Sequence, residues 1–345
     1  MFGFNKLFGL DIGNGAVKSC EISASSKSAK LNKISFVKTD SAAYKNGEVL
    51  NPSLLGNLIK ESLGKIKIKK TVIGVSGSSV MVKKITIPRM DVELLPEQVR
   101  WEAEQYIPYN IDEVNIDYIV LESKASSDTM DLLLVAAQQN RILQYVELVS
   151  SLKLKVELID VSSFALANCF MFNYPQAKDS TVGLIDIGAF FTHFVVLHKG
   201  EVVFCRDIPS GGGAFDEELS KNLGIPVEEA VQIKESGESM PDIAVDTLKS
   251  VGKRYSDQLV GAVEFFTETT QGTNLERFYL TGGGSLTPGL LELLSAGLKK
   301  PVQFMDVLQK ITPSSAVLKE VSEIDLQYRS AVALGLALRK PGDSK

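Results

Sequence analysis

A short acidic and glycine-rich segment near the start of the chain has the composition of a phosphate-binding hairpin. Asp11, Gly13 and Gly15 follow an apolar run, and Lys18 comes shortly after the last glycine. Glycines let backbone N–H groups approach phosphate oxygens closely, and a lysine supplies a positive charge. An aspartate can hold Mg²⁺ through water, because bound Mg²⁺ keeps most of its waters. For a single copy of this motif, a tight turn with a capping aspartate is the alternative interpretation.

The segment recurs about half a chain later. Residues 7–13 and 182–188 are both apolar runs that end in Asp-Ile-Gly, and a second β-rich run follows each. Asn14-Gly15 is a strong two-residue turn signal, which predicts a hairpin in the first copy. The recurrence predicts a duplicated domain in which each half opens with a hairpin, although strings this short can also coincide by chance. The second copy offers similar groups, namely Asp186, Gly188, Thr192 and His193.

A triple-glycine loop is the third candidate ligand contact. Gly282, Gly283 and Gly284 follow a predicted strand at residues 278–281 and precede a predicted helix at 288–298. Such a loop allows the backbone to approach a ligand closely. An ordinary strand-to-helix connection is the alternative, although three glycines cost more chain entropy than that connection requires.

Two insertions interrupt the predicted halves. Residues 82–160 show the order β-α-β-β-α-β, which predicts a small inserted α+β subdomain. Residues 214–272 predict a helical insertion in the second half. We therefore expect an α/β fold with duplicated halves. The expected first-half core comprises residues 1–81, 161–181 and 325–345, and the expected second-half core comprises 182–213 and 273–324.

Composition excludes several classes of protein. The chain has 345 residues and a formal net charge of −5, which argues against nucleic acid as the main partner. Its three cysteines show no CxxC spacing and it has two histidines, so neither a disulfide framework nor a zinc site is indicated. No apolar run reaches the roughly 18 residues needed to span a bilayer. We expect a cytoplasmic protein without direct membrane insertion.

The order of these motifs resembles that of the actin-like ATPase superfamily, whose fold has duplicated RNase H-like halves. Within it, the chain is most similar to the PilM family of type IV pilus assembly. The most specific part of the resemblance is the string WEAEQYIPY at residues 101–109, and the ending at 329–339 adds to it. The resemblance covers essentially the whole chain. It also implies that Ala165 and Ala167 face Gly335 where two helices cross at the hinge between the halves, although core packing explains these alanines equally well.

The resemblance implies that ATP and Mg²⁺ bind between the halves. Gly282, Gly283 and Gly284 would border the adenosine, and Lys234 would approach the ribose or base, unless it is simply a solvated helix charge. Asp11 and Asp186 would hold Mg²⁺ through water. The implied phosphate contacts are Asp11, Gly13, Asn14, Gly15 and Lys18 on one side, and Asp186, Gly188 and Thr192 on the other.

Hydrolysis is less strongly implied than binding. Attack on the terminal phosphate needs an oriented water, and actin orients it with a glutamine from its first connecting segment. The matching segment here, residues 157–167, contains no glutamine. Asp160 and His193 are the remaining catalytic candidates beside Asp11 and Asp186. We therefore expect an ATP-binding switch with slow or negligible turnover.

The inserted subdomain is the expected place for partner recognition. The resemblance implies that it docks the short cytoplasmic tail of a PilN-like single-pass membrane protein. The chain would then lie at the inner face of the cytoplasmic membrane. The resemblance also implies contacts with other pilus assembly proteins and allows a homo-oligomer. Trp101 and Tyr109 are the candidate contacts, with Tyr106 and Tyr118 as further aromatic residues, because aromatic residues are favoured interface anchors. The alternative is that these rings fill a small core, which applies more to Tyr106 than to Trp101.

The sequence also leaves two other functions open. A filament-forming division protein of the FtsA type is disfavoured because such proteins end in an amphipathic anchor helix, whereas this sequence ends in KPGDSK. A sugar kinase-type phosphotransferase of the same superfamily is disfavoured because the sequence shows no clear sugar-binding constellation.

Overall fold

The structure, a computed structural model, describes residues 7–25, 27–121, 128–236, 240–270 and 273–340. Its first sheet has the strand order β10–β6–β1–β2–β3–β16. The strands β1, β2 and β3 form antiparallel neighbours, whereas β6, β10 and β16 add in parallel. The bounds are β1 (Phe8–Ile12), β2 (Ala16–Ala24), β3 (Ala29–Lys38), β6 (Lys70–Val75), β10 (Lys155–Val161) and β16 (Ile311–Pro313).

The second sheet repeats this arrangement. Its strand order is β13–β12–β11–β14–β15, with β11, β12 and β13 antiparallel and β14 and β15 parallel. Every residue of β11 is buried, as expected for a strand that is covered on both faces. The shared order confirms that the fold is duplicated. The bounds are β11 (Thr181–Ile187), β12 (Thr192–His198), β13 (Glu201–Ile208), β14 (Arg277–Thr281) and β15 (Val302–Phe304).

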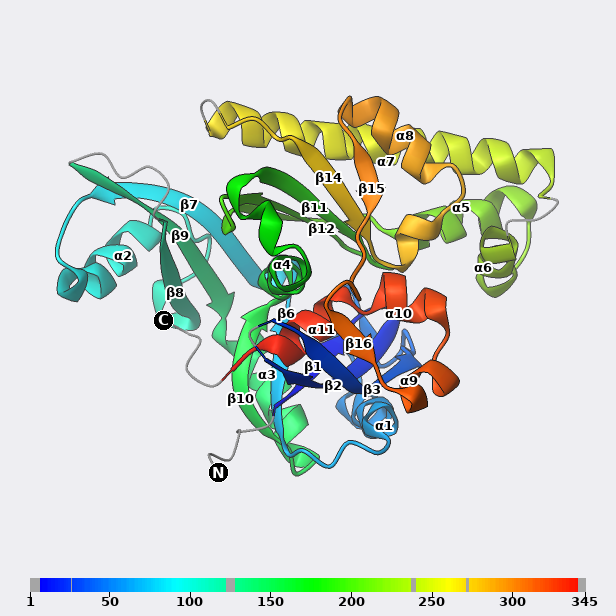
Figure 1. The fold of residues 1–345 in the computed structure, drawn as a ribbon, viewed down its shortest axis with the longest axis horizontal. Coiled ribbons are helices and arrows are strands. Elements are labelled where there is room, and N and C mark those ends of the chain that lie inside the picture. Colours follow the sequence, from blue (N-terminus) through cyan, green and yellow to red (C-terminus); the bar gives the residue numbers. More distant parts are fainter. Residues whose placement is uncertain (1–6, 26, 122–127, 237–239, 271–272, 341–345) are drawn as a thin grey trace.

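Two helices, α4 (Ser162–Asn173) and α11 (Ala331–Leu338), lie between the sheets (Figure 1). They are rich in small residues, which allows an unusually close crossing. A Cβ added at Gly335 would lie 1.8 Å from the carbonyl oxygen of Ala165. The crossing of Ala165 with Gly335 that we expected is therefore confirmed.

In the part of the chain that the structure describes, five further helices cover the outer faces of these two sheets. Apolar residues of α1 and α3 pack against the first sheet, and those of α5, α7 and α8 pack against the second. The long helix α7 runs along the top of the molecule in Figure 1. The bounds are α1 (Pro52–Leu63), α3 (Gln139–Ser151), α5 (Gly212–Leu223), α6 (Val227–Ser236), α7 (Asp242–Thr269), α8 (Leu290–Leu298), α9 (Ser315–Glu320) and α10 (Glu323–Arg329), with a short pair of strands β4 (Tyr44–Lys45) and β5 (Glu48–Val49).

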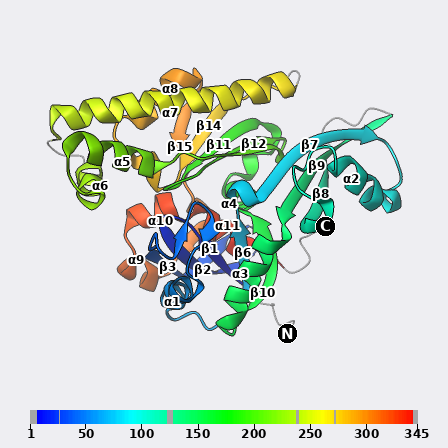
Figure 2. The same cartoon turned by 180° about the vertical axis from the view of Figure 1, so that it is seen from behind.

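A third sheet projects to one side, at the left in Figure 1 and at the right in Figure 2. It has the order β7–β9–β8, and α2 packs on it to form a separate apolar core. We call these elements the inserted block. Their bounds are β7 (Val80–Pro88), α2 (Leu95–Ala103), β8 (Val114–Leu121) and β9 (Thr129–Gln138).

Two strands lie outside the segments in which we expected them. We placed β10 in the inserted block, but it pairs in parallel with β6 in the first sheet, and α3 packs beside it. We placed β16 in the second half, but it pairs with β3 at the edge of the first sheet. Apolar alternation identifies a strand but does not say which sheet supplies its neighbour. Among the described residues, no helix has the length and apolar character required to cross a membrane.

Candidate functional site

The first hairpin brings an acidic and a basic side chain together. Asp11 on β1 and Lys18 on β2 are directly opposite in the register. The Lys18 ammonium lies 2.8 Å from Asp11 Oδ2. The turn between them closes through Gly13, whose N–H donates to the Ala16 carbonyl at 3.1 Å. Asn14 is also used, because its side-chain oxygen accepts the backbone N–H of Asn46 at 2.6 Å.

The second hairpin has the same construction. Asp186 on β11 stands opposite His193 on β12, and the Gly188 N–H donates to the Phe191 carbonyl at 2.9 Å. Each of these residues occupies the same place in its hairpin as its counterpart in the first. His193 is therefore the structural counterpart of Lys18, a relation that the sequence analysis did not identify.

Both hairpins open into one cleft of about 520 Å³ between the halves. The antiparallel register turns Asp11 and Lys18 to the same face, and it does so again for Asp186 and His193. The cleft also receives residues from the glycine loop and from α6. The predicted residues that line it are Asp11, Gly13, Asn14, Gly15, Lys18, Asp186, Gly188, His193, Lys234, Gly282, Gly283 and Gly284.

The charge of Asp186 in the cleft is incompletely compensated. Burial raises the pKa of Asp186 above its ordinary value, and the charges of Asp11 and Asp207 add to this effect. The cations Lys18 and His193 oppose the rise without cancelling it. Burial lowers the pKa of Lys18, but Asp11 and Asp186 outweigh it and hold this pKa above its ordinary value. The site is thus suited to an additional cation beside a group that Lys18 can neutralise.

His193 is held as a cation. Its Nδ1 lies 2.6 Å from Asp207 Oδ1 on β13. Burial lowers the pKa of His193, but Asp207, Asp186 and Asp11 together raise it to about 9. The same contact holds the pKa of Asp207 below its ordinary value despite burial. Since Nδ1 is used by Asp207, Nε2 is the nitrogen available to a ligand in the cleft.

Close backbone contacts explain the glycine loops. A Cβ at Gly282 would lie 2.3 Å from the Ile187 carbonyl oxygen, and one at Gly284 would lie 3.0 Å from the Gly212 nitrogen. A second triple-glycine run, Gly211 to Gly213, was not predicted; it forms the N-terminus of α5 and packs on the second hairpin. The Gly212 N–H donates to the Gly188 carbonyl at 2.8 Å. A search for three consecutive glycines after a predicted strand would have found this run.

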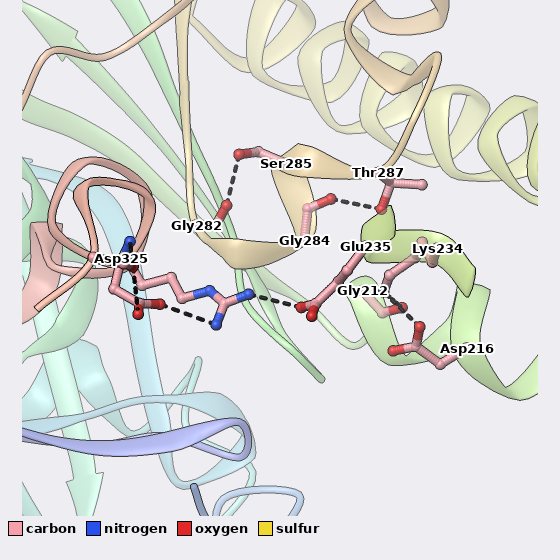
Figure 3. Close-up of polar contacts among 11 residues, drawn as sticks. Gly212, Asp216, Lys234, Glu235, Gly282, Gly284, Ser285, Thr287 and Asp325 are labelled. Atoms are coloured by element: carbon pink, nitrogen blue, oxygen red, sulfur yellow. Dashed lines mark hydrogen bonds and ion pairs between the residues drawn. The ribbon is translucent and has the colours of Figure 1, made fainter. Parts of the chain in front are cut away.

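Lys234 enters the cleft from α6 but is already paired. Its ammonium lies 2.6 Å from Asp216 Oδ1 and donates to the Gly212 carbonyl at 3.2 Å (Figure 3). Both side chains of the pair are largely buried. Lys234 therefore ties α6 to the start of α5, and it borders the cleft beside the glycine run rather than being a solvated helix charge.

Arg329 on α10 is a cleft residue that the sequence analysis did not single out. It donates to Glu235 at 2.8 Å and lies 3.1 Å from Asp325. Figure 3 shows these two carboxylates approaching from opposite sides. A Cβ at Gly283 would lie 3.0 Å from Arg329 Nε, so the side chain crosses the glycine loop. The sequence could not predict that Arg329 lines the cleft, because one arginine in a short helix with several charged residues is a common pattern.

Two predicted residues do not line the cleft. Thr192 is fully buried, and its hydroxyl donates to the Ser210 carbonyl at 2.7 Å and contacts the Tyr255 hydroxyl. It adjoins His193 in one strand, and adjacent side chains point to opposite faces. Asp160 is buried near Arg339, with 3.5 Å between Oδ2 and Nη1. It is absent from the cleft lining, so its predicted catalytic role is not supported by its position.

The aromatic residues of the inserted block divide into two groups. Trp101 is 67% exposed and Tyr109 is 44% exposed. Tyr106 and Tyr118 instead pack against the core of the block, and the Lys83 ammonium lies 3.9 Å from the centre of the Tyr106 ring. The two rings predicted to contact a partner are therefore the accessible ones.

Comparison with known proteins defines the class first. The fold is that of the actin-like ATPases. It resembles MreB 5 of Spiroplasma citri bound to AMPPNP, with a TM-score of 0.52, 12% identity, and coverage of 95% of this chain and 94% of that chain. At this identity the likeness shows the fold alone.

The family follows from the sequence. The family model described as type IV pilus assembly protein PilM matches residues 9–341, and the chain belongs to this family. A solved PilM–PilN type IV pilus biogenesis complex has a TM-score of 0.86 and 26% identity, with coverage of 97% of this chain and 98% of that chain.

Two curated relatives match more distantly. The cell division protein FtsA of Bacillus subtilis is 23% identical over 305 residues, which cover 80% of this chain and 64% of FtsA. The ethanolamine utilization protein EutJ of Escherichia coli is 30% identical over 112 residues, which cover 32% of this chain and 36% of EutJ. The matches thus span just under two thirds of the length of FtsA and about a third of the length of EutJ.

Proposed function

We propose that this protein binds ATP with Mg²⁺ in the cleft between its halves. The observation that carries the proposal is the convergence of two matched hairpins, each with an aspartate opposite a cation, on one cleft. Lys18 and His193 would neutralise phosphate charge, and Gly13, Gly15 and Gly188 would admit phosphate oxygens to the backbone. Support comes from the similar fold of an MreB protein that binds AMPPNP.

The residues of the cleft fit a hydrated magnesium ion. Asp11 and Asp186 would hold it. Burial, with a smaller effect from the neighbouring acidic groups, raises the pKa of Asp186, and a nearby cation would stabilise its ionised form. Among the residues that the structure describes, no cluster of three or more His, Cys, Asp or Glu side chains could hold a metal ion. A Mg²⁺ ion in the cleft would therefore depend on phosphate oxygens and water as well. When bound, the ion would neutralise phosphate charge.

The same geometry favours binding over turnover. A general base must accept a proton, and a histidine whose pKa is about 9 is already protonated at neutral pH. Asp160 lies outside the cleft. We therefore infer a nucleotide-binding switch with slow or negligible hydrolysis. Sustained hydrolysis at about 1 s⁻¹ or faster, in the range of typical kinases, would contradict this part of the proposal.

We further propose that the inserted block docks the short cytoplasmic tail of a PilN-like membrane protein. Trp101 and Tyr109 are exposed there, and Val92 and Leu94 add exposed apolar surface in the 3₁₀ turn just before α2. Large aromatic side chains supply much of the binding energy of interfaces. The solved PilM–PilN complex supports this choice of partner. Such docking would hold the protein at the inner face of the cytoplasmic membrane among other pilus assembly proteins.

Calorimetric titration with a synthetic PilN-like N-terminal peptide tests the proposal. We expect saturable binding with and without Mg·ATP. Trp101→Ala should weaken it at least about fivefold, because truncation of an interface anchor costs more than about 1 kcal/mol. Lys18→Ala should still bind the peptide, since Lys18 lies in the cleft. Phe265→Ala removes a comparably exposed ring from α7 and should bind like the wild type. Absence of peptide binding in a protein that still binds ATP would exclude the docking role.

A further inference from the structure

Asp207 joins three segments that are far apart in the chain. One carboxylate oxygen, Oδ1, accepts a hydrogen bond from His193 Nδ1 at 2.6 Å. The other, Oδ2, accepts the backbone N–H of Gly77 at 2.6 Å. The Ser163 hydroxyl at the start of α4 also donates to Oδ1 at 3.4 Å. A buried carboxylate held by several donors has a well-defined position, so a displacement of one donor affects the others.

Gly77 is the entrance to the inserted block. The strand β6 ends at Val75, Ser76 lines the cleft, and a single 3₁₀ turn, Gly77–Ser79, leads directly into β7. The amide that Asp207 holds therefore lies between a cleft residue and the first strand of the block. A shift of this turn changes the starting point of β7.

The second hairpin touches the same turn independently. A Cβ at Gly77 would lie 2.8 Å from the Phe191 ring, and Gly77 has a φ of +77°. Phe191 is the residue whose carbonyl closes the turn of the second hairpin by accepting the Gly188 N–H. The hairpin thus contacts the entrance of the inserted block in two ways. The Phe191 ring packs on Gly77, and His193 is linked to Gly77 through the hydrogen bonds of Asp207.

We propose that Asp207, held between the His193 ring and the Gly77 amide, couples the phosphate end of the cleft to the inserted block. This inference rests on the proposed function, because it takes the occupant of the cleft to be a nucleotide phosphate. A phosphate oxygen near His193 Nε2 competes with Asp207 for the positive charge of the ring. The strength of the hydrogen bond from Gly77 then depends on whether that phosphate is present.

The inserted block is also attached to the second half elsewhere. Leu121 and Leu133, from β8 and β9, belong to the same apolar cluster as Phe194 on β12. The block therefore rests on the second sheet through packing and is held at its entrance by Asp207. A ligand shifts the position of the inserted block only if its contacts differ between two positions of the block. The hydrogen bond between Gly77 and Asp207 is such a contact, because it depends on the occupant of the cleft.

Amide hydrogen exchange of residues 77–88, with and without saturating Mg·ATP, tests the coupling. Asp207→Asn keeps the shape of the side chain but removes its charge. Glu201→Gln is the matched control, because Glu201 faces His198 on the same two strands that carry Asp207 and His193. Calorimetry on the same samples reports nucleotide binding separately. His193→Gln breaks the chain of contacts at its other end, and it keeps the test possible if Asp207→Asn does not fold.

We expect Mg·ATP to change exchange in this segment at least about fivefold in the wild type and in Glu201→Gln, the lower range of coupling between sites. Asp207→Asn and His193→Gln, both at saturating nucleotide, should reduce the change to less than about twofold. Nucleotide binding without any change in the wild type would overturn the coupling and leave the proposed function intact. A full response in Asp207→Asn would overturn it as well. Absence of nucleotide binding in the wild type would contradict the proposed function itself.

Discussion

Each half of the molecule presents an aspartate and a cation from neighbouring strands. An isolated carboxylate is costly to bury, and an opposite charge within ion-pair distance offsets that cost. Lys18 does this for Asp11 at 2.8 Å. His193 is instead paired with Asp207 at 2.6 Å. Burial raises the pKa of Asp186, and the charges of His193 and Lys18 only partly offset that rise. The two halves are therefore similar in construction but unequal in charge.

The charge of His193 makes stability depend on pH. Its folded-state pKa of about 9 lies above the ordinary value of 6.5. The stabilising contribution is therefore complete below the ordinary pKa and is lost as the pH rises through about 9. His193→Gln removes it. We expect the free energy of unfolding lost in this variant to be on the order of 3 kcal/mol larger at about pH 6 than at about pH 9.5.

Urea unfolding of the wild type and His193→Gln at both pH values measures this difference. Comparing the two proteins at each pH cancels the titration of groups that they share. A loss that is the same at both pH values would contradict a cationic His193.

Short-range geometry decides which site residues are predictable. The glycine turn fixes the register of the first hairpin, so Asp11 and Lys18 could be paired from the sequence. Thr192 and His193 are neighbours in one strand, and only one of them can face the cleft. The sequence does not say which one, and the structure selects His193. The roles of Asp207 and Arg329 depend on contacts between distant segments and could not be predicted.

At the scale of elements, the helices α4 and α11 control how the halves meet. Their crossing admits no side chain at Gly335, because the backbone of Ala165 occupies that space. Small residues at a helix crossing allow the two backbones to approach each other. Both sheets pack against these helices in one apolar cluster, so the crossing lies where the two halves meet.

Gly335→Ala should therefore destabilise the protein. A Cβ 1.8 Å from a carbonyl oxygen forces the helices apart, and overpacking of this kind costs roughly 1–3 kcal/mol or more. Gly261→Ala, in the middle of α7 with open space around its Cβ, is the matched substitution. This substitution should raise the free energy of unfolding by roughly 0.5–1 kcal/mol, because alanine is a better helix former than glycine. Chemical denaturation of both variants measures the contrast, and equal effects would argue against a tight crossing.

Most elements were predictable, but their partners were less so. The two opening hairpins, α2, and the strands β7 and β8 followed from local apolar patterns. The strand β10 was predicted as a strand but was assigned to the inserted block. Its neighbour in the sheet, β6, is far from it in sequence, because the whole inserted block lies between them. Pairing between distant strands is set by the packing of the whole sheet and leaves no local signal.

At the scale of the whole molecule, a ligand in the cleft contacts both halves at once. A ligand that binds only the folded protein stabilises it by mass action, by about 2.7 kcal/mol at a hundredfold excess over its dissociation constant. We expect Mg·ATP to raise the melting temperature in a concentration-dependent way. At equal concentration, AMP with Mg²⁺ should raise it much less, because it lacks the phosphates that Lys18 and His193 would contact. Thermal unfolding by circular dichroism measures both, and equal shifts would place recognition outside the phosphate end.

The overall architecture was predictable because the same motif occurs twice. Two Asp-Ile-Gly strings, each after an apolar strand, predicted two halves and a cleft between them. The way in which the inserted block rests on the second half was not predictable. It depends on packing of Leu121 and Leu133 into a core supplied by the other half.

The central claim is that the phosphate end of this cleft binds Mg·ATP, and calorimetric titration of Mg·ATP tests it most directly. We expect saturable binding by the wild type, and affinity at least about tenfold weaker in Lys18→Ala, a loss of about 1.4 kcal/mol or more. Lys221→Ala removes the same charge from an exposed position on α5 and should bind like the wild type. Absence of binding in the wild type, or unchanged affinity in a folded Lys18→Ala variant, would contradict the account.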